Sequence, residues 1–256
     1  MSKSNPHNLH SKTDLPVTVR AALSIWVPIL LAALTAVLLP PDTTNSGPLA
    51  IAPIFAVLGI TSWFMGLLWY GLSQMGLRGQ RPLFSSIGFA VLLWITFLLF
   101  RFIFVKMEAF GRGGIAGQTF IYLLLFEAFA VQIWAFGLVF RTLAEWRGAL
   151  TAAFASGILF GMVAYLLFQE SFNGSVSSLL YFLLWGILYG IIRLRTGSIL
   201  GMVLVQSLQS FTAWTVLYPE AQPAPEQLQS LYLAVSVVYL IILWRLWPKQ
   251  ESDYRV

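Results

Sequence analysis

Eight long runs of apolar residues, separated by short polar turns, dominate this sequence. A helix needs about 20 mostly apolar residues to cross the hydrocarbon layer of a membrane. The runs therefore predict eight transmembrane helices, over residues 21–39, 49–72, 83–100, 115–140, 149–168, 176–192, 197–217 and 228–244. We expect an all-α fold, a polytopic membrane helical bundle in contact with the lipid bilayer, because helices satisfy their own backbone hydrogen bonds in lipid.

The composition excludes an ordinary soluble domain. Hydrophobic residues make up 58% of the chain and charged residues 10%, and the mean hydropathy is +0.79. A water-facing surface needs far more charge than this. The chain has no cysteine, which excludes disulfides, thiolate metal sites and a thiol nucleophile. We interpret the net charge of +5 as loops facing anionic lipid rather than as a nucleic-acid surface.

The placement of lysine and arginine predicts the orientation of the chain. Of the 15 basic residues, three (Arg101, Lys106 and Arg112) fall in loops that would be outside if the N-terminus is cytoplasmic, and the other twelve fall on the inside. Cytoplasmic loops carry such an excess of positive charge. We expect both termini to lie in the cytoplasm and the membrane to be the bacterial cytoplasmic membrane.

Three blocks in the C-terminal half carry a shared pattern. They are Phe140-Arg141-Thr142-Leu143, then Phe160-Gly161-Met162-Val163-Ala164, then a Thr-Gly-Ser turn at 196–198 followed by Gln206 and, four residues later, Ser210. These blocks resemble those of the CAAX-protease and bacteriocin-processing (CPBP, Abi-like) intramembrane metalloproteases. That family reads roughly EExxxRG, then FxxxH, then a Thr-Gly-Ser turn and HxxxN.

The resemblance implies a degenerate member of that family. It puts Arg141 at the motif arginine and Phe160 at the motif aromatic. It leaves the paired glutamates replaced by Phe136 and Gly137, the two motif histidines by Ala164 and Gln206, and the motif asparagine by Ser210. Both histidines of the chain, His7 and His10, lie in its polar N-terminal tail. The resemblance therefore implies no metal, no cofactor and a vestigial catalytic site.

Glu127 is the one carboxylate near the middle of a predicted span, where an ionised side chain costs ~3 kcal/mol or more unless it is paired. The first motif can also be aligned in a second register, in which Glu127 is its first glutamate. In that register Ala128 replaces the second glutamate and Gln132 replaces the arginine. We prefer the Arg141 register. We interpret Glu127 as a protonated acid that is hydrogen-bonded to Gln132, Gln206 or a serine, and the alternative is a functional carboxylate.

Two further patterns concern the last four spans. Gln206, Gln209 and Ser210 share one helix face and, with Glu127 and Gln132, would line a polar interior. Glycines spaced four apart, in the runs 157–161 and 186–190, let helix backbones approach closely. We interpret them as internal packing of the bundle.

The residues divide into a polar cytoplasmic tail (1–20), one transmembrane bundle (21–247) with a CAAX-protease-like core over about 115–217, and a second cytoplasmic tail (248–256). We expect a non-catalytic binding, scaffold or assembly protein whose partner is another membrane protein or a hydrophobic peptide, with no role for nucleic acid. One alternative is an active intramembrane endopeptidase of the CAAX type with an unconventional site around Glu127. The other is a proton-linked small-solute carrier that uses Glu127.

Overall fold

The computed structural model describes residues 13–39, 51–77, 83–105, 120–168, 175–212 and 223–255. Seven helices in these ranges are long and apolar enough to cross a membrane, and an eighth apolar helix is shorter. They are α1 (Val17–Leu38), α2 (Ala52–Trp69), α3 (Leu83–Phe104), a composite fourth span (Phe120–Arg147), α7 (Ala149–Phe168), α8 (Val176–Thr196), α9 (Leu200–Phe211) and α10 (Pro225–Leu246). The predicted fold class, an all-helical membrane bundle, is confirmed.

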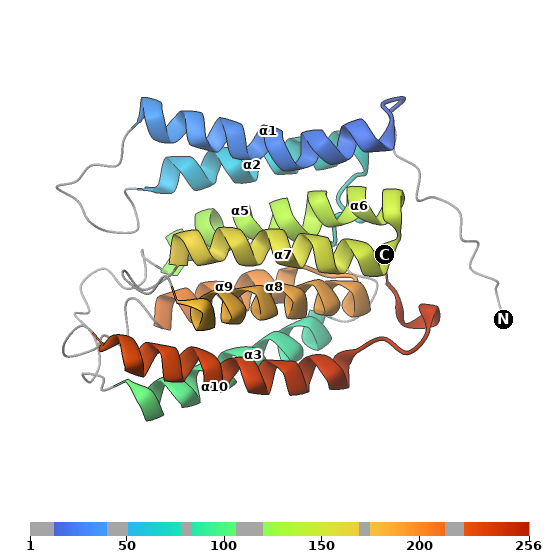
Figure 1. Ribbon diagram of the computed structural model, residues 1–256. Helices are drawn as coiled ribbons and strands as arrows, with labels where there is room; N and C mark the ends of the chain where they lie inside the picture. The colour runs from blue at the N-terminus through green and yellow to red at the C-terminus, as the bar shows by residue number, and fades with distance from the viewer. Residues whose placement is uncertain are drawn as a thin grey trace.

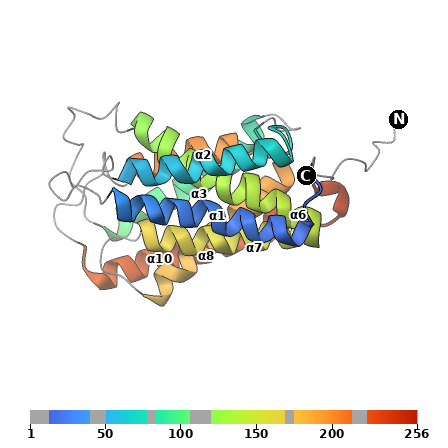
Figure 2. The same ribbon diagram turned by 90° about the horizontal axis from the view of Figure 1, so that it is seen from above.

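The helices form four stacked layers (Figure 1). α1 and α2 make one outer layer, the fourth span packs with α7, and α3 and α10 make the other outer layer. α8 and α9 lie at the same level in Figure 1, but Figure 2, turned by 90°, shows them on different sides of the bundle: α8 packs against α7 and α10, and α9 packs against α3 and the fourth span. The centre is the most enclosed part, because 78% of the apolar window of the fourth span is buried, against 22% for α1. The fourth span is therefore the core around which the other helices pack.

The fourth span is not a regular α-helix. It contains the π-helical segments η2 (Leu123–Ala128) and η3 (Ile133–Val139), which flank the short helix α5 (Phe129–Gln132), and it ends in α6 (Phe140–Arg147). A π-helical turn bonds residues five apart and is frequent at functional sites. Glu127 lies in η2, and Gln132 is the last residue of α5.

Several predicted helix ends differ from the structure by three residues or more, and two of them bear on the site. The fourth span continues to Arg147 instead of ending at residue 140, and Gly148, with φ of +90°, turns the chain directly into α7. The predicted loop is thus helical, and Arg141 in it is buried and hydrogen-bonded inside the bundle. The seventh predicted span, 197–217, begins three residues later as α9, since Gly197 ends α8 with φ of +72°. Residues 213–217 lie outside the described residues.

The seam between α7 and α8 is a contact between backbones. A Cβ atom added to Gly186 would lie 2.0 Å from the carbonyl oxygen of Gly157, and one added to Gly190 would lie 2.1 Å from that of Ala153. Only glycine permits this approach. The predicted internal packing of the two glycine runs is confirmed.

The described arginines and lysine gather at one end of the bundle, with the exception of Arg101 in the last turn of α3. Arg20 at the start of α1 pairs with Glu145 of α6, and the guanidinium of Arg195 at the end of α8 donates to the carbonyl oxygen of Leu246 at the end of α10. We call this end the arginine-rich end. The beginning of α1 and the end of α10 both lie there (Figure 1).

Candidate functional site

Four polar side chains meet inside the bundle, and we call them the interior cluster: Glu127, Gln132, Gln206 and Ser210. The hydroxyl of Ser210 donates to Oε1 of Glu127 at 2.5 Å, and Nε2 of Gln132 donates to Oε1 of Gln206 at 2.6 Å. Gln206 and Ser210 are four apart on α9 and share one face. Glu127 and Gln132 are five apart, and the wide π turn brings both toward that face.

The interior cluster is enclosed but not fully hydrogen-bonded. Gln132 and Gln206 are completely buried, and Glu127 is 5% exposed. Within the described part of the chain, Oε1 of Gln132 and Nε2 of Gln206 have no hydrogen-bond partner. Buried polar atoms are normally paired. The cluster thus presents one unused acceptor and one unused donor on adjacent amides.

Gln209 extends the polar interior toward α8. Its Nε2 donates to the hydroxyl of Tyr181 at 3.0 Å, while its Oε1 has no partner among the described residues. The ring of Tyr181 stacks on the ring of Tyr239 of α10, and the hydroxyl of Tyr239 donates to the carbonyl oxygen of Leu93 in α3. Sequence reasoning did not identify Tyr181, because nothing in its spacing separates it from the other aromatic residues of its span.

The chemistry open to the interior cluster is limited by its residue types. It contains one carboxylate, two amides and a hydroxyl, and amide oxygens are poor zinc ligands beside imidazole, thiolate or carboxylate. In the ranges that the structure covers, no group of three or more His, Cys, Asp or Glu residues is placed to hold a metal ion. The hydroxyl of Ser210 donates to Glu127, so the one carboxylate of the cluster is also the hydrogen-bond acceptor of its one hydroxyl. The arrangement can hold a proton or bind polar groups of a ligand.

Other positions assigned by the resemblance lie in the apolar core. The rings of Phe136 and Phe160 are 5.4 Å apart, and both contact the ring of Tyr189. Ala164 follows Phe160 by one turn of α7 and is completely buried. A Cβ atom on Gly137 would lie 3.3 Å from the side chain of Ile133. These positions fill space between helices.

Arg141 is not a loop residue of the kind that orients a membrane protein. Its side chain is 1% exposed, its Nε donates to Oε1 of Gln74 at 3.0 Å, and its guanidinium lies 5.4 Å from the ring centre of Tyr70. Arg141 is one of the twelve basic residues that the sequence places on the inside, but it lies in helix α6 and is buried. Its burial follows from the continuation of the fourth span through α6.

The structure groups the residues of the alternative register. Glu127 and Gln132 contact Ser210 and Gln206, which are the positions that the resemblance gives to the third motif. The preferred register placed the first motif around Arg141, whose described side-chain hydrogen bond goes to the turn after α2. Proximity to the third motif thus favours the register that starts at Glu127.

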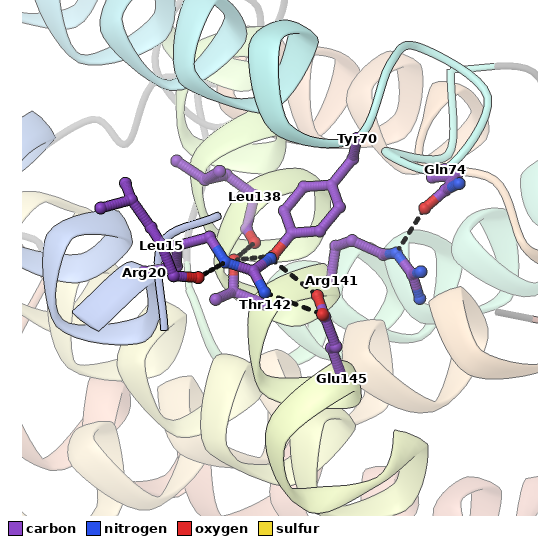
Figure 3. Close-up of polar contacts among 8 residues, drawn as sticks. All are labelled: Leu15, Arg20, Tyr70, Gln74, Leu138, Arg141, Thr142 and Glu145. Carbon is purple, nitrogen blue, oxygen red and sulfur yellow. Dashed lines mark hydrogen bonds and ion pairs between the residues drawn. The ribbon is translucent and has the colours of Figure 1, made fainter. Parts of the chain in front are cut away.

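A second polar group, at the arginine-rich end, was missed by sequence reasoning (Figure 3). We call it the end cluster: Arg20, Tyr70, Thr142 and Glu145. Arg20 donates to both carboxylate oxygens of Glu145 at 2.8 Å and to the hydroxyl of Tyr70 at 2.7 Å. The Tyr70 hydroxyl donates to Thr142 at 3.3 Å, and burial raises the pKa of Tyr70, which keeps it protonated for this role. The only sequence signal is charge near two span ends.

The fold and the buried polar sites define a multi-pass membrane protein. Residues 112–212 match the family model of the Rce1-like type II CAAX prenyl endopeptidases, so this part of the chain is similar to that family. The whole interior cluster lies within this match, whereas Arg20 and Tyr70 of the end cluster lie before it. No curated protein and no solved structure matches the chain.

Proposed function

We propose that the Rce1-like domain is a pseudoprotease and that the protein acts as a non-catalytic binding, scaffold or assembly protein in the membrane. The observation that carries this proposal is the bond between Gln132 and Gln206. Gln206 stands where the resemblance puts a metal-binding histidine, and its amide oxygen is engaged by a second amide.

The other positions favour the same conclusion. Catalytic zinc sites use about three protein ligands and an open position for water, and the interior cluster offers one carboxylate. Glu127 accepts a hydrogen bond from Ser210, which stands at the motif asparagine. Ala164, at the other motif histidine, is a small apolar residue buried in α7. A metal-activated water therefore has no set of ligands in this cluster.

The unused amide atoms support a peptide as the bound partner. Oε1 of Gln132 accepts and Nε2 of Gln206 donates, and one peptide group offers the matching donor and acceptor. A transmembrane or hydrophobic segment of another protein has its peptide groups exposed where its helix is interrupted. The cluster would bind such a segment without cleaving it.

A proton-linked carrier is the second candidate, because one observation favours it. Glu127 is a buried carboxylate inside a membrane span, and an intramembrane carboxylate is often part of a proton path. The hydroxyl of Tyr122 interacts electrostatically with Glu127 and, in the described ranges, has no hydrogen-bond partner. Water bound there would give Glu127 a proton donor.

Glu127→Gln separates the binding role from chemistry at Glu127. The amide keeps the shape and most of the hydrogen bonding of a neutral acid but cannot ionise. For a binding protein we expect the same cross-linked partner from native membranes, and an unchanged cellular phenotype, as with the wild type. A well-folded Glu127→Gln protein that recovers the partner but has lost the phenotype would count against the binding role.

We further propose that the arginine-rich end faces the cytoplasm, since basic residues are retained on that side. Reporters inserted at Gly148 and at Ser175 test this orientation, because these residues lie at opposite ends of α7 and α8. Gly148 should report a cytoplasmic position and Ser175 an external one. The reverse pair of signals would invert the topology.

A further inference from the structure

The turn that follows α2, residues 70–77, enters the bundle and contacts helices of the Rce1-like match, although the turn itself lies before that match. We call it the α2 turn. Met75 in this turn is completely buried, and a Cβ atom added to Gly137 of η3 would lie 3.4 Å from the main-chain oxygen of Met75. The main-chain oxygen of Gly76 accepts a hydrogen bond from the N–H of Ile199, at the start of α9, at 3.0 Å. The α2 turn therefore contacts both η3 and the start of α9.

Arg193, in the last turn of α8, joins the α2 turn to η3. Its Nε donates to the carbonyl oxygen of Phe136 in η3, and its Nη2 donates to the carbonyl oxygen of Gln74 in the α2 turn, both at 3.0 Å. The side chain is 1% exposed, and its guanidinium lies 5.0 Å from the ring centre of Phe140. A Cβ atom on Gly76, whose φ is +83°, would lie 2.8 Å from Cζ of Arg193. The planar guanidinium bonds two separate main chains at once, which the single ammonium of lysine cannot do in the same geometry.

These main-chain contacts lie one and two helical turns from the two amides of the interior cluster. Gln206 follows Ile199 by seven residues, which is two turns of α9, so the two residues share a face. Gln132 precedes Phe136 by four residues, which is about one turn of the fourth span. The contacts of Arg193 and of the α2 turn thus lie along the same two helices as the bond between Gln132 and Gln206.

The start of α9 depends on the α2 turn for a hydrogen bond. The first N–H groups of a helix have no partner within it, and the side chain of the N-cap residue Ile199 makes no capping bond. The N–H of Ile199 is bonded to Gly76 of the α2 turn, and that of Leu200 to the hydroxyl of Ser198 at 3.3 Å. A shift at this end is carried along the 12 residues of α9 to Gln206, because a packed helix moves as a rigid element.

We propose that Arg193 and the α2 turn are positioning elements for the interior cluster. They fix η3 relative to the start of α9, and so place the amides of Gln132 and Gln206 within hydrogen-bonding distance. The α2 turn lies outside the Rce1-like match, so a segment from outside the match completes the interior cluster. The consequence for partner binding rests on the proposed function, whereas the consequence for the amide pair does not.

Two lysine substitutions at the end of α8 test this role. Arg193→Lys keeps the charge and loses the two-way bond. Arg195→Lys is the matched control, because Arg195 donates instead to the carbonyl oxygen of Leu246 at the end of α10. In each background a double-mutant cycle with leucine at Gln132 and Gln206 measures their coupling in detergent micelles. We expect a coupling of about threefold in the unfolding equilibrium constant for the wild type and for Arg195→Lys, and none for Arg193→Lys.

Hydrogen exchange in nanodiscs gives an independent readout. The amides of residues 133–139 and 200–206 should exchange about tenfold faster in Arg193→Lys than in Arg195→Lys, because the contacts that hold both segments are weakened. If Arg193→Lys does not fold, Gly76→Ala replaces it with the same expectation, since its Cβ atom would displace the guanidinium.

The outcomes separate this inference from the proposed function. A role in stability alone would lower the free energy of unfolding and leave the coupling between the two amides intact, so an intact coupling in Arg193→Lys would overturn the proposal. Recovery of the cross-linked partner from native membranes is scored separately. A lost coupling with unchanged recovery supports the positioning role and counts against binding at the interior cluster.

Discussion

The two clusters both hold polar side chains inside an apolar bundle, but the groups that pair with one another differ. The end cluster uses charges, with the forked pair of Arg20 and Glu145 at 2.8 Å. The interior cluster uses two neutral amides and a hydroxyl beside one carboxyl group. Arg20 lies near the beginning of α1 and Glu145 near the end of α6, where ionised side chains cost less than they do in the middle of a membrane span.

The clusters also join different parts of the chain. The end cluster joins α1 and the end of α2 to α6 by hydrogen bonds, so it connects helices outside the Rce1-like match to a helix within it. The interior cluster joins η2 and α5 to α9 entirely within the match. The comparison indicates that the end cluster stabilises the fold and that the interior cluster is the place to look for function.

The largest effect is expected at the end cluster. Glu145→Ala leaves the buried Arg20 without its partner, and we expect a loss of about 3 kcal/mol in the free energy of unfolding, in keeping with broken buried ion pairs. Denaturation in mixed micelles measures it. The paired variant Arg20→Met with Glu145→Met removes both charges and should be much less destabilised. An unaffected Glu145→Ala protein would show that the pair contributes nothing.

A smaller effect is expected at Glu127. Glu127→Leu removes the acceptor of the Ser210 hydroxyl and should destabilise by on the order of 1 kcal/mol, whereas Glu127→Gln should change stability little. The same micelle denaturation compares the two variants. Equal losses for Leu and Gln would mean that the ionised carboxylate stabilises the fold, and the interior cluster would then resemble the end cluster.

The smallest effect is the coupling between the two amides. A double-mutant cycle of Gln132→Leu and Gln206→Leu should give a coupling energy of about 0.6 kcal/mol, the typical value for a hydrogen bond between transmembrane helices. The pair Gln132→Leu and Gln209→Leu is the control, since the described side-chain bond of Gln209 goes to Tyr181. Coupling as strong in the control pair would mean that the bond has no specific role.

The bundle could be predicted from the sequence because apolar length is sufficient for it. Seven runs are long helices in the structure, and 149–168 has the predicted bounds. The limits of this signal appear at α6, where Arg141 and Glu145 look like loop residues until the partners Gln74 and Arg20, distant in sequence, are known.

The candidate site could be predicted only in part. The spacing of Gln206 and Ser210 on one helix face, and the isolated carboxylate of Glu127, predicted side chains that the structure brings together in the interior cluster. The register of the first motif was not settled by spacing, because the π-helical turns that bring Glu127 and Gln132 to α9 have no signature in the sequence. Such turns depend on tertiary packing rather than on local propensity.

The zinc content of the purified protein tests the pseudoprotease proposal most directly. A chain whose motif histidines are replaced by Ala164 and Gln206 should carry no stoichiometric zinc when elemental analysis follows purification in mild detergent. Removal of His7 and His10 excludes binding by the N-terminal tail. We expect far less than one zinc ion per chain in both forms; one zinc ion per chain, retained without the two histidines, would contradict the proposal and restore an active metalloprotease.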